Sequence, residues 1–198
     1  MATKNAGKLR ELEALFTGTR FELATFDAYE DPVEGETSYA DNAALKARAL
    51  HAQLRLAGIS GAVLADDSGL EVTALGGRPG VMTAYYGGRG LTWSDRRRAL
   101  LDELAGHGPE ADRRARFVCA LHFIAPSGHE LTTMGTVDGE IVTEERGELG
   151  FSFDPVFFYP PAGRTFAELS AAEKNCVSHR TAAAEALLKA LVSPADGG

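Results

Sequence analysis

Two adjacent carboxylates, Asp66 and Asp67, directly follow an apolar run over 62–65. The run predicts a buried strand that ends at the two acids. Successive strand residues point to opposite faces, so one carboxylate can turn inward while the other meets solvent, a substrate or a hard cation. The same residues also fit a plain turn, in which Asp66 and Ser68 bond their own backbone and Gly69 takes a positive φ. Taken alone, the motif leaves both interpretations open.

The second candidate site is a short polar segment near the N-terminus, made up of Thr3, Lys4, Asn5, Ala6, Gly7 and Lys8. Apolar residues over 9–16 then recur at spacings of three and four, which predicts an amphipathic helix. Free N–H groups and the positive end of the dipole meet at a helix N-terminus, so phosphate is a natural ligand there. The segment is not a Walker A loop, because the leading glycine and four-residue spacer are missing. An exposed helix start that carries lysines is the alternative.

Aromatic residues are concentrated in the third segment, residues 150–158. One strand face cannot bury all of them, and aromatic rings in a loop can stack on a flat ligand at ~1–3 kcal/mol per base. Asp154 could accept a hydrogen bond from a sugar hydroxyl or orient a neighbouring donor. The alternative is a packed cluster around Pro155, which we prefer for Phe157 and Phe158.

The fourth segment gathers the cations Lys174, His179 and Arg180 around Ser178. Ser178 is the predicted N-cap of an alanine- and leucine-rich helix that runs to about Leu191. Cations in a first helical turn are unfavourable with respect to the helix dipole, so a negative or hydrogen-bond-accepting group should compensate. We therefore expect a cluster that faces a ligand.

In order and content, the four segments resemble the inosine triphosphate pyrophosphatase family, hydrolases of non-canonical purine nucleoside triphosphates. The resemblance covers nearly the whole chain and rests on residues 2–11, 65–72 with 74–81, 150–155 and 173–180. Two rival classes stay open. One is a Maf-like pyrophosphatase that acts on modified pyrimidine nucleotides, and the other is a non-catalytic nucleotide-binding module.

The resemblance implies a role for each matching residue. Asp67 is the expected general base, which activates water to split the triphosphate into a monophosphate and pyrophosphate, and it is also a Mg²⁺ ligand. Glu34 is the expected second metal carboxylate, with Glu36 as the alternative, because the nearby glycine is displaced from the family pattern. The expected substrate-binding residues are Thr3, Lys4, Asn5, Ala6, Gly7 and Lys8, then Ser68, then Phe151, Ser152, Phe153 and Asp154 at the base and sugar, and Lys174, His179 and Arg180 at the base.

The sequence departs from the family pattern in two places. Ser152 and Phe153 stand where the family more usually has Gly and Tyr, which removes a phenol hydroxyl. Met1 and Ala2 leave no room for the apolar strand that the family places before the Thr-x-Asn loop. We expect either a shortened first strand or a start upstream.

Composition restricts the class of protein. A chain of 198 residues with 44% hydrophobic residues can bury one core, or one core with a smaller lobe. Its 20 basic and 28 acidic residues give a net charge of −8, which argues against a nucleic-acid polymer as partner. Cys119 and Cys176 lack metal-ligand spacing, which indicates reduced thiols, with Cys119 in the core. Apolar runs stay below the ~20 residues that span a bilayer, and no export signal is present, so we expect a soluble, cytoplasmic protein.

Periodicity predicts an α/β fold. Helices are expected from Tyr39 to about Ala57, with Leu45, Ala49, Ala52 and Leu56 on the buried stripe, and over about 92–104. A strand over 116–125 should form a hairpin with 131–137. The resemblance implies a long mixed β-sheet with flanking helices in two lobes around a central cleft. It also implies one domain over 1–192, a flexible tail over 193–198 and a homodimer.

Overall fold

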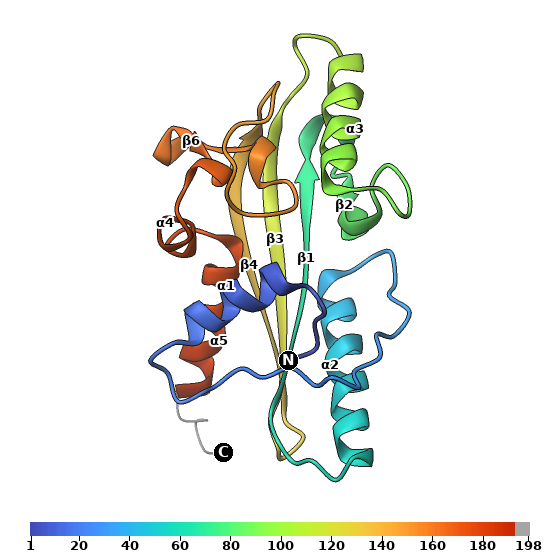
Figure 1. The fold of residues 1–198 in the computed structure, drawn as a ribbon, viewed down its shortest axis with the longest axis vertical. Coiled ribbons are helices and arrows are strands. Elements are labelled where there is room, and N and C mark those ends of the chain that lie inside the picture. Colours follow the sequence, from blue (N-terminus) through green and yellow to red (C-terminus); the bar gives the residue numbers. More distant parts are fainter. Residues whose placement is uncertain (193–198) are drawn as a thin grey trace, which may run out of the picture. The chain divides into compact units, whose positions relative to one another are not determined.

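A computed structural model describes residues 1–192 (Figure 1), so the predicted tail at 193–198 lies outside the described residues. The helices are α1 (Ala6–Phe16), α2 (Tyr39–Leu56), α3 (Trp93–Gly106), α4 (Ala171–Asn175) and α5 (His179–Val192). The strands are β1 (Val63–Val72), β2 (Pro79–Gly80), β3 (Arg114–Ile124), β4 (Glu130–Ile141), β5 (Phe157–Tyr159) and β6 (Arg164–Thr165). Among residues 1–192, every helix is too short or too polar to span a membrane.

The strands form one six-stranded sheet in the order β2-β1-β3-β4-β5-β6. Antiparallel pairing sets Leu70 opposite Gly80 in β1 and β2, and Ile141 opposite Phe157 in β4 and β5. A single parallel bridge joins Ala2 to Ala65. The predicted α/β class with flanking helices is confirmed, although within residues 1–192 the strands pair antiparallel and only the isolated Ala2–Ala65 bridge is parallel.

The chain divides into two compact units. Unit 1 comprises Met1–Asp67, Cys119–Gly135 and the residues from His179 onward, and unit 2 comprises Ser68–Val118 and Thr136–Ser178. In unit 1, α1 packs against α5 on one side of the strands, and α2 lies on the other side (Figure 1). Unit 2 contains α3, α4, β2, β5 and β6.

Alternating strand residues build the two cores of unit 1. Leu64 of β1 joins the core that contains Leu12 of α1 and Leu187 of α5. Val63 and Ala65 join the core beside α2. The period-2 geometry of a strand therefore directs even positions of this part of β1 toward α1 and α5, and odd positions toward α2.

A close backbone approach fixes the start of α5 in unit 1. At Gly135 of β4, an added Cβ atom would lie 2.2 Å from the carbonyl oxygen of His179 and 2.3 Å from the backbone nitrogen of Ala183. Any side chain at this position would force α5 away from the strand.

Two sequence predictions about these elements were wrong. β1 does not stop at the paired acids but continues through Asp66, Asp67 and Ser68 to Val72, and Gly69 is not among the glycines with positive φ. The alternative interpretation of Asp66 to Gly69 as a turn is therefore wrong as well. The stripe of α2 is also different: Leu45 is 39% and Leu56 is 90% exposed, while the buried residues of this helix are Tyr39, Asn42, Ala43, Ala44, Lys46, Ala47 and Leu50.

Candidate active site

Asp66 and Asp67 lie in the middle of β1 and face opposite sides of it. Asp66 is an even position, and its ion-pair partners in unit 1 come from α1 and α5. Asp67 is an odd position, and its contacts come from α2. The prediction that the two acids point in opposite directions is confirmed, although a continuous strand produces the effect rather than a strand end.

Asp66 is the acceptor of a buried cationic cluster. Its Oδ1 contacts the ammonium of Lys8, and its Oδ2 lies 3.5 Å from Nε of Arg180. The thiol of Cys119 donates to the same Oδ2 at 3.2 Å. Burial alone would raise the pKa of Asp66, but the positive charges of Lys8, Arg180 and Lys46 outweigh it and hold that pKa far below its ordinary value. Asp66 is therefore a permanent anion that fixes its neighbours.

Arg180 is shared between two acids. Its Nη1 lies 2.8 Å from Oε2 of Glu11, and the guanidinium is 4% exposed. Burial opposes the charge, but Asp66 and Glu11 raise the pKa of Arg180 above its ordinary value. These acids are the compensating negative groups expected for cations in the first turn of α5. His179, the first residue of α5, is also buried.

The N-terminal segment is folded into a cap for α1. The Oδ1 of Asn5 accepts hydrogen bonds from the backbone nitrogens of Gly7 at 2.9 Å and Lys8 at 3.1 Å. Thr3 accepts one from the backbone of Asn5 at 3.1 Å. The helix start expected at the polar segment is confirmed, and Ala6, Gly7 and Lys8 lie within α1. Lys4 lies beside it, 3.1 Å from Asp31.

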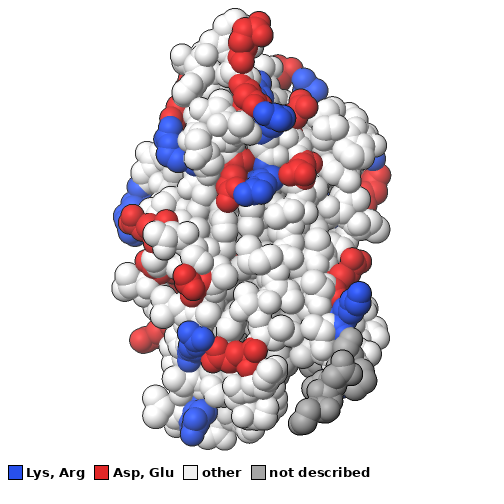
Figure 2. Space-filling model, turned by 180° about the vertical axis from the view of Figure 1, so that it is seen from behind, with Lys and Arg blue, Asp and Glu red and all other residues white. Residues whose placement is uncertain are grey.

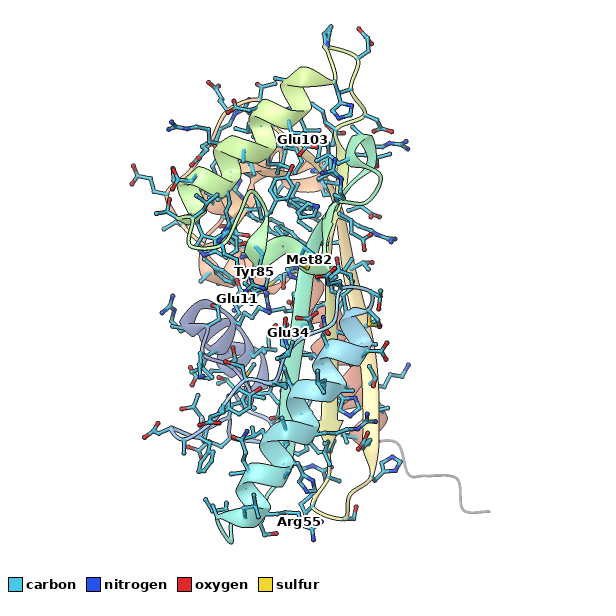
Figure 3. All side chains as sticks on the ribbon, turned by 90° about the vertical axis from the view of Figure 1, so that its right-hand side faces the viewer. Glu11, Glu34, Arg55, Met82, Tyr85 and Glu103 are labelled. Atoms are coloured by element: carbon cyan, nitrogen blue, oxygen red, sulfur yellow. The ribbon has the colours of Figure 1, made fainter. Side chains whose placement is uncertain are left out.

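Asp67 and Glu34 converge on one cation. The ammonium of Lys46 lies 2.7 Å from Oδ1 of Asp67 and 3.1 Å from Oε1 of Glu34. The other oxygen of Asp67 accepts a hydrogen bond from the amide of Asn42 at 3.3 Å. Figure 3 labels Glu34 beside the N-terminal end of α2, with Arg55 at the far end of that helix.

The pKa values of Asp67 and Lys46 are both raised, for different reasons. Burial raises the pKa of Asp67 and the carboxylate of Asp66 adds to it, while Lys46 and Lys8 act in the opposite direction without cancelling the rise. For Lys46, burial lowers the pKa, but Asp67, Asp66 and Glu34 outweigh it and raise the value. Asp67 therefore accepts a proton more readily than an ordinary carboxylate does, which suits a general base.

These residues fit a divalent cation. Glu34 and Asp67 supply hard oxygen ligands, and the Lys46 ammonium already brings them to a single positive charge. Magnesium is commonly bound by one or two carboxylates, with water and phosphate oxygens completing the shell. Among residues 1–192, no group of three or more His, Cys, Asp or Glu side chains could hold a metal.

Unit 2 contains a buried ion pair between Asp154 and Lys174. The Nζ of Lys174 lies 2.5 Å from Oδ2 of Asp154, and 4.8 Å from the ring centroid of Phe151 and 5.5 Å from that of Phe166. Asp154 also accepts from the backbone nitrogen of Phe151 at 2.7 Å. Gly150 permits this packing, because it has a φ of 74° and an added Cβ would lie 2.2 Å from the carboxylate. Lys174, Asp154 and Phe151 thus form one cluster.

The rest of the aromatic segment packs within unit 2. Phe153 is fully buried, and its ring lies edge-on to Trp93, with centroids 5.7 Å apart. Ser152 has a φ of 59°, and its carbonyl oxygen accepts a hydrogen bond from Nη1 of Arg97 at 2.9 Å. Phe157 is fully buried, as preferred from the sequence, whereas Phe158 is only half-buried. Within this segment, Phe151 is therefore the ring that touches the lysine.

Sequence reasoning missed three residues of these clusters: Lys46, Asn42 and Glu11. Neither Lys46 nor Asn42 belongs to the apolar stripe predicted for this helix, yet they are 6% and 2% exposed. A signal was present, because they are four residues apart and so share one face of the helix. Glu11 follows Lys8 by three residues, so these two side chains also share one face of α1. Ser68, which was predicted as a substrate contact, is half-buried at the start of unit 2.

Comparison with known proteins assigns this arrangement to a family. The model of the Ham1 family matches residues 1–190. The chain belongs to the Ham1 family. It is 45% identical over 186 residues to a dITP/XTP pyrophosphatase of Geobacillus kaustophilus, covering 92% of this chain and 88% of that protein. It is also 45% identical over 193 residues to a dITP/XTP pyrophosphatase of Thermus thermophilus, covering 96% of this chain and 89% of that protein.

A solved Ham1 structure has the same fold. The HAM1 protein from Coxiella burnetii superposes with a TM-score of 0.81 at 34% identity, covering 96% of this chain and 95% of that chain. This Ham1-family chain therefore matches its relatives over nearly their whole length, and the resemblance inferred from the four segments is confirmed.

Proposed function

We propose that this chain hydrolyses the non-canonical purine nucleoside triphosphates ITP, dITP and XTP to the monophosphate and pyrophosphate. Relatives at 45% identity are dITP/XTP pyrophosphatases. The observation that carries the proposal is the convergence of Glu34 and Asp67 on one buried cation. The reaction adds one water across a phosphoanhydride bond and so consumes no other reactant.

We assign the chemical step to Asp67. Its carboxylate takes a proton from the attacking water, and its raised pKa favours that transfer. Asn42 and Lys46 each hold one of its oxygens, so the carboxylate cannot rotate freely. Proton transfer of this kind contributes ~10²–10⁴-fold, and positioning and charge neutralisation supply the remainder.

We assign the metal to Glu34 and Asp67, and we propose Mg²⁺. When bound, the cation neutralises phosphate charge and polarises the anhydride that breaks. The ammonium groups of Lys8 and Lys46 add positive charge in the same unit. Thr3, Lys4, Asn5, Ala6 and Gly7 are proposed phosphate contacts together with Lys8, and Ser68 is a further substrate contact.

We assign base and sugar recognition to Phe151, Ser152, Phe153, Asp154, Lys174, His179 and Arg180. Phe151 supplies the aromatic surface, and Lys174 supplies a cation held by Asp154. Phe153 contributes through its backbone, because its ring is fully buried. A 6-oxo purine presents an acceptor where adenine presents an amino donor, so cationic donors favour inosine and xanthosine.

The surface charge agrees with a small-molecule substrate. On the face drawn in Figure 2, acidic and basic side chains alternate and most of the area is uncharged. Such a surface lacks the continuous basic field that attracts a nucleic-acid polymer. By resemblance to the family, we propose a cytoplasmic homodimer, for which light scattering coupled to gel filtration is the test.

A panel of nucleoside triphosphates, with pyrophosphate and orthophosphate measured separately, tests the proposal. We expect pyrophosphate from ITP, dITP and XTP, with little from ATP. Release from dTTP or UTP instead would support the Maf-like alternative. Binding of ITP with no product in the presence of Mg²⁺ would support a non-catalytic module.

A further inference from the structure

The segment over residues 30–37 carries Glu34 but contains no helix or strand. Two side-chain amides of α2 hold it by the same geometry. Asn42 accepts from the backbone nitrogen of Gly35 at 2.8 Å and donates to its carbonyl oxygen at 3.0 Å. Gln53 accepts from the nitrogen of Glu30 and donates to its carbonyl oxygen, both at 3.0 Å. Each side-chain amide thus bonds both the backbone N–H and the backbone carbonyl of one residue, as a neighbouring strand does in an antiparallel sheet.

Asn42 makes a third bond in addition to this pairing. Its Nδ2 also donates to Oδ2 of Asp67 at 3.3 Å. Its own backbone is fixed in the first turn of α2, where its nitrogen donates to the carbonyl of Ser38 at 3.1 Å. Asn42 is 2% exposed, so water cannot easily replace these bonds.

Lys46 completes the geometry one helical turn further on. It lies four residues after Asn42 and therefore projects from the same face of α2. It contacts the second oxygen of Asp67 at 2.7 Å, and Glu34 at 3.1 Å. The helix consequently fixes both oxygens of Asp67 and both backbone groups of Gly35, the residue directly after Glu34.

We infer that Asn42 is a positioning residue that sets the separation between the carboxylates of Glu34 and Asp67, and so the affinity of the site for a divalent cation. The inference rests on the proposed function, in which these two carboxylates hold the metal. Hydrogen-bond partners of metal ligands commonly change metal affinity or activity by ~10–100-fold when they are lost. Gln53 gives the matched comparison, because its side-chain amide makes the same pairing on the same segment, at Glu30.

Amide hydrogen exchange of the metal-free protein tests the pairing itself. We expect Asn42→Ala and Asn42→Leu to speed exchange at Gly35, and Gln53→Ala to speed exchange at Glu30. Asn42→Leu keeps the number and branching of the side-chain heavy atoms, so it removes the hydrogen bonds without leaving the cavity that alanine would leave. Gly35→Ala is a further control. An added Cβ there would lie 3.5 Å from Oδ1 of Asn42, an ordinary contact, so exchange at residue 35 should stay slow.

Binding of Mn²⁺ to the free protein, followed by electron paramagnetic resonance, tests the consequence. We expect both Asn42 variants to bind Mn²⁺ ~10–100-fold more weakly, and Gln53→Ala to stay within about twofold of the wild type. With ITP as substrate, the Mg²⁺ concentration for half-maximal rate should rise in parallel, and saturating Mg²⁺ should recover most of kcat. Circular dichroism and melting curves identify any variant that fails to fold.

Faster exchange at Gly35 with unchanged Mn²⁺ affinity in the Asn42 variants would overturn the inference and leave Asn42 a purely structural tie. Equal loss of affinity in Gln53→Ala would overturn it too, because general loosening of the segment would then explain both variants. A wild-type protein that binds no Mn²⁺ and hydrolyses ITP without a divalent cation would instead overturn the proposed metal site. A wild type that binds Mn²⁺ but leaves ITP intact would overturn the proposed activity, and the Asn42 comparison would still stand.

Discussion

Asp66 and Asp67 are neighbours in sequence, yet β1 holds them on opposite faces, where their pKa values move in opposite directions. Cations surround Asp66 from α1 and α5, so it stays charged. At Asp67, Lys46 and Lys8 lower the pKa by less than burial raises it, so this carboxylate takes up a proton more readily. Pairs of titratable groups whose environments push them apart divide into structural and reactive roles. We therefore propose Asp67 as the reactive member.

Replacement of Asp67, the proposed general base, tests this division into a structural and a reactive carboxylate. We expect Asp67→Asn to lower kcat for ITP by ~10²–10⁴-fold, because the amide cannot accept the proton from water. The isosteric amide should preserve the strand, so circular dichroism should be unchanged. Pyrophosphate release measures the rate. Turnover close to that of the wild type would contradict the proposed mechanism.

Replacement of Asp66 should affect stability instead. We expect Asp66→Asn to lower the free energy of unfolding at pH 7 by about 3–5 kcal/mol, because it removes one partner of a buried ion pair. The folded pKa of Asp66 lies below its unfolded value, so its contribution is complete above about pH 4 and is lost as pH falls further toward the folded pKa. Urea unfolding at several pH values measures this. A difference between variant and wild type that persists unchanged at pH 2 would contradict the assignment.

Lys46 holds the two carboxylates that we assign to the metal. We expect Lys46→Met to raise the affinity of the free protein for Mn²⁺, because the ammonium no longer competes for the same oxygens. Turnover of ITP should fall, since a positive charge near Asp67 is lost. Titration of the free protein with Mn²⁺ measures the first effect. Weaker binding in Lys46→Met would show that the lysine supports the site instead of competing with the cation.

The backbone of the aromatic segment offers a test of strain. Ser152 has a φ of 59°, a conformation that costs a residue with a Cβ atom about 1–2 kcal/mol relative to glycine. We expect Ser152→Gly to raise the melting temperature of the protein. Gly150→Ala is the opposing control, because its Cβ would clash with Asp154. A lower melting temperature in Ser152→Gly would mean that its hydroxyl stabilises the loop.

Base selection is tested at Arg180. We expect Arg180→Ala to reduce kcat/KM for ITP and XTP much more than for ATP, since sites built around such a hydrogen bond discriminate by ~10⁴–10⁵. Glu11→Gln is the control, because it removes a partner of Arg180 and keeps the guanidinium. An equal loss for ITP and ATP in Arg180→Ala would assign Arg180 to the ion-pair cluster of Asp66 and Glu11, and base recognition to Lys174 or His179.

The sequence was informative where a local rule decides the outcome. The spacing of apolar residues over 9–16 located α1, and Asn5 caps it as a residue of that type should. The same kind of reasoning failed where tertiary contacts override local patterns. Lys46 looks like a solvated charge on α2, and only the approach of Asp67 from a distant strand makes its burial favourable. β1 likewise continues through two acids because α1, α5 and α2 supply their counter-charges.

Gly135 makes one part of this protein intolerant of mutation, although glycine has no side chain to take part in the reaction. Because α5 begins within 2.2 Å of where a side chain would stand, even alanine would displace the backbone that carries His179 and Arg180. In a saturation library, we therefore expect position 135 to accept glycine alone, while exposed Val33 accepts most residues. Selection on such a library would mark Gly135 as essential, although its contribution is the absence of a side chain.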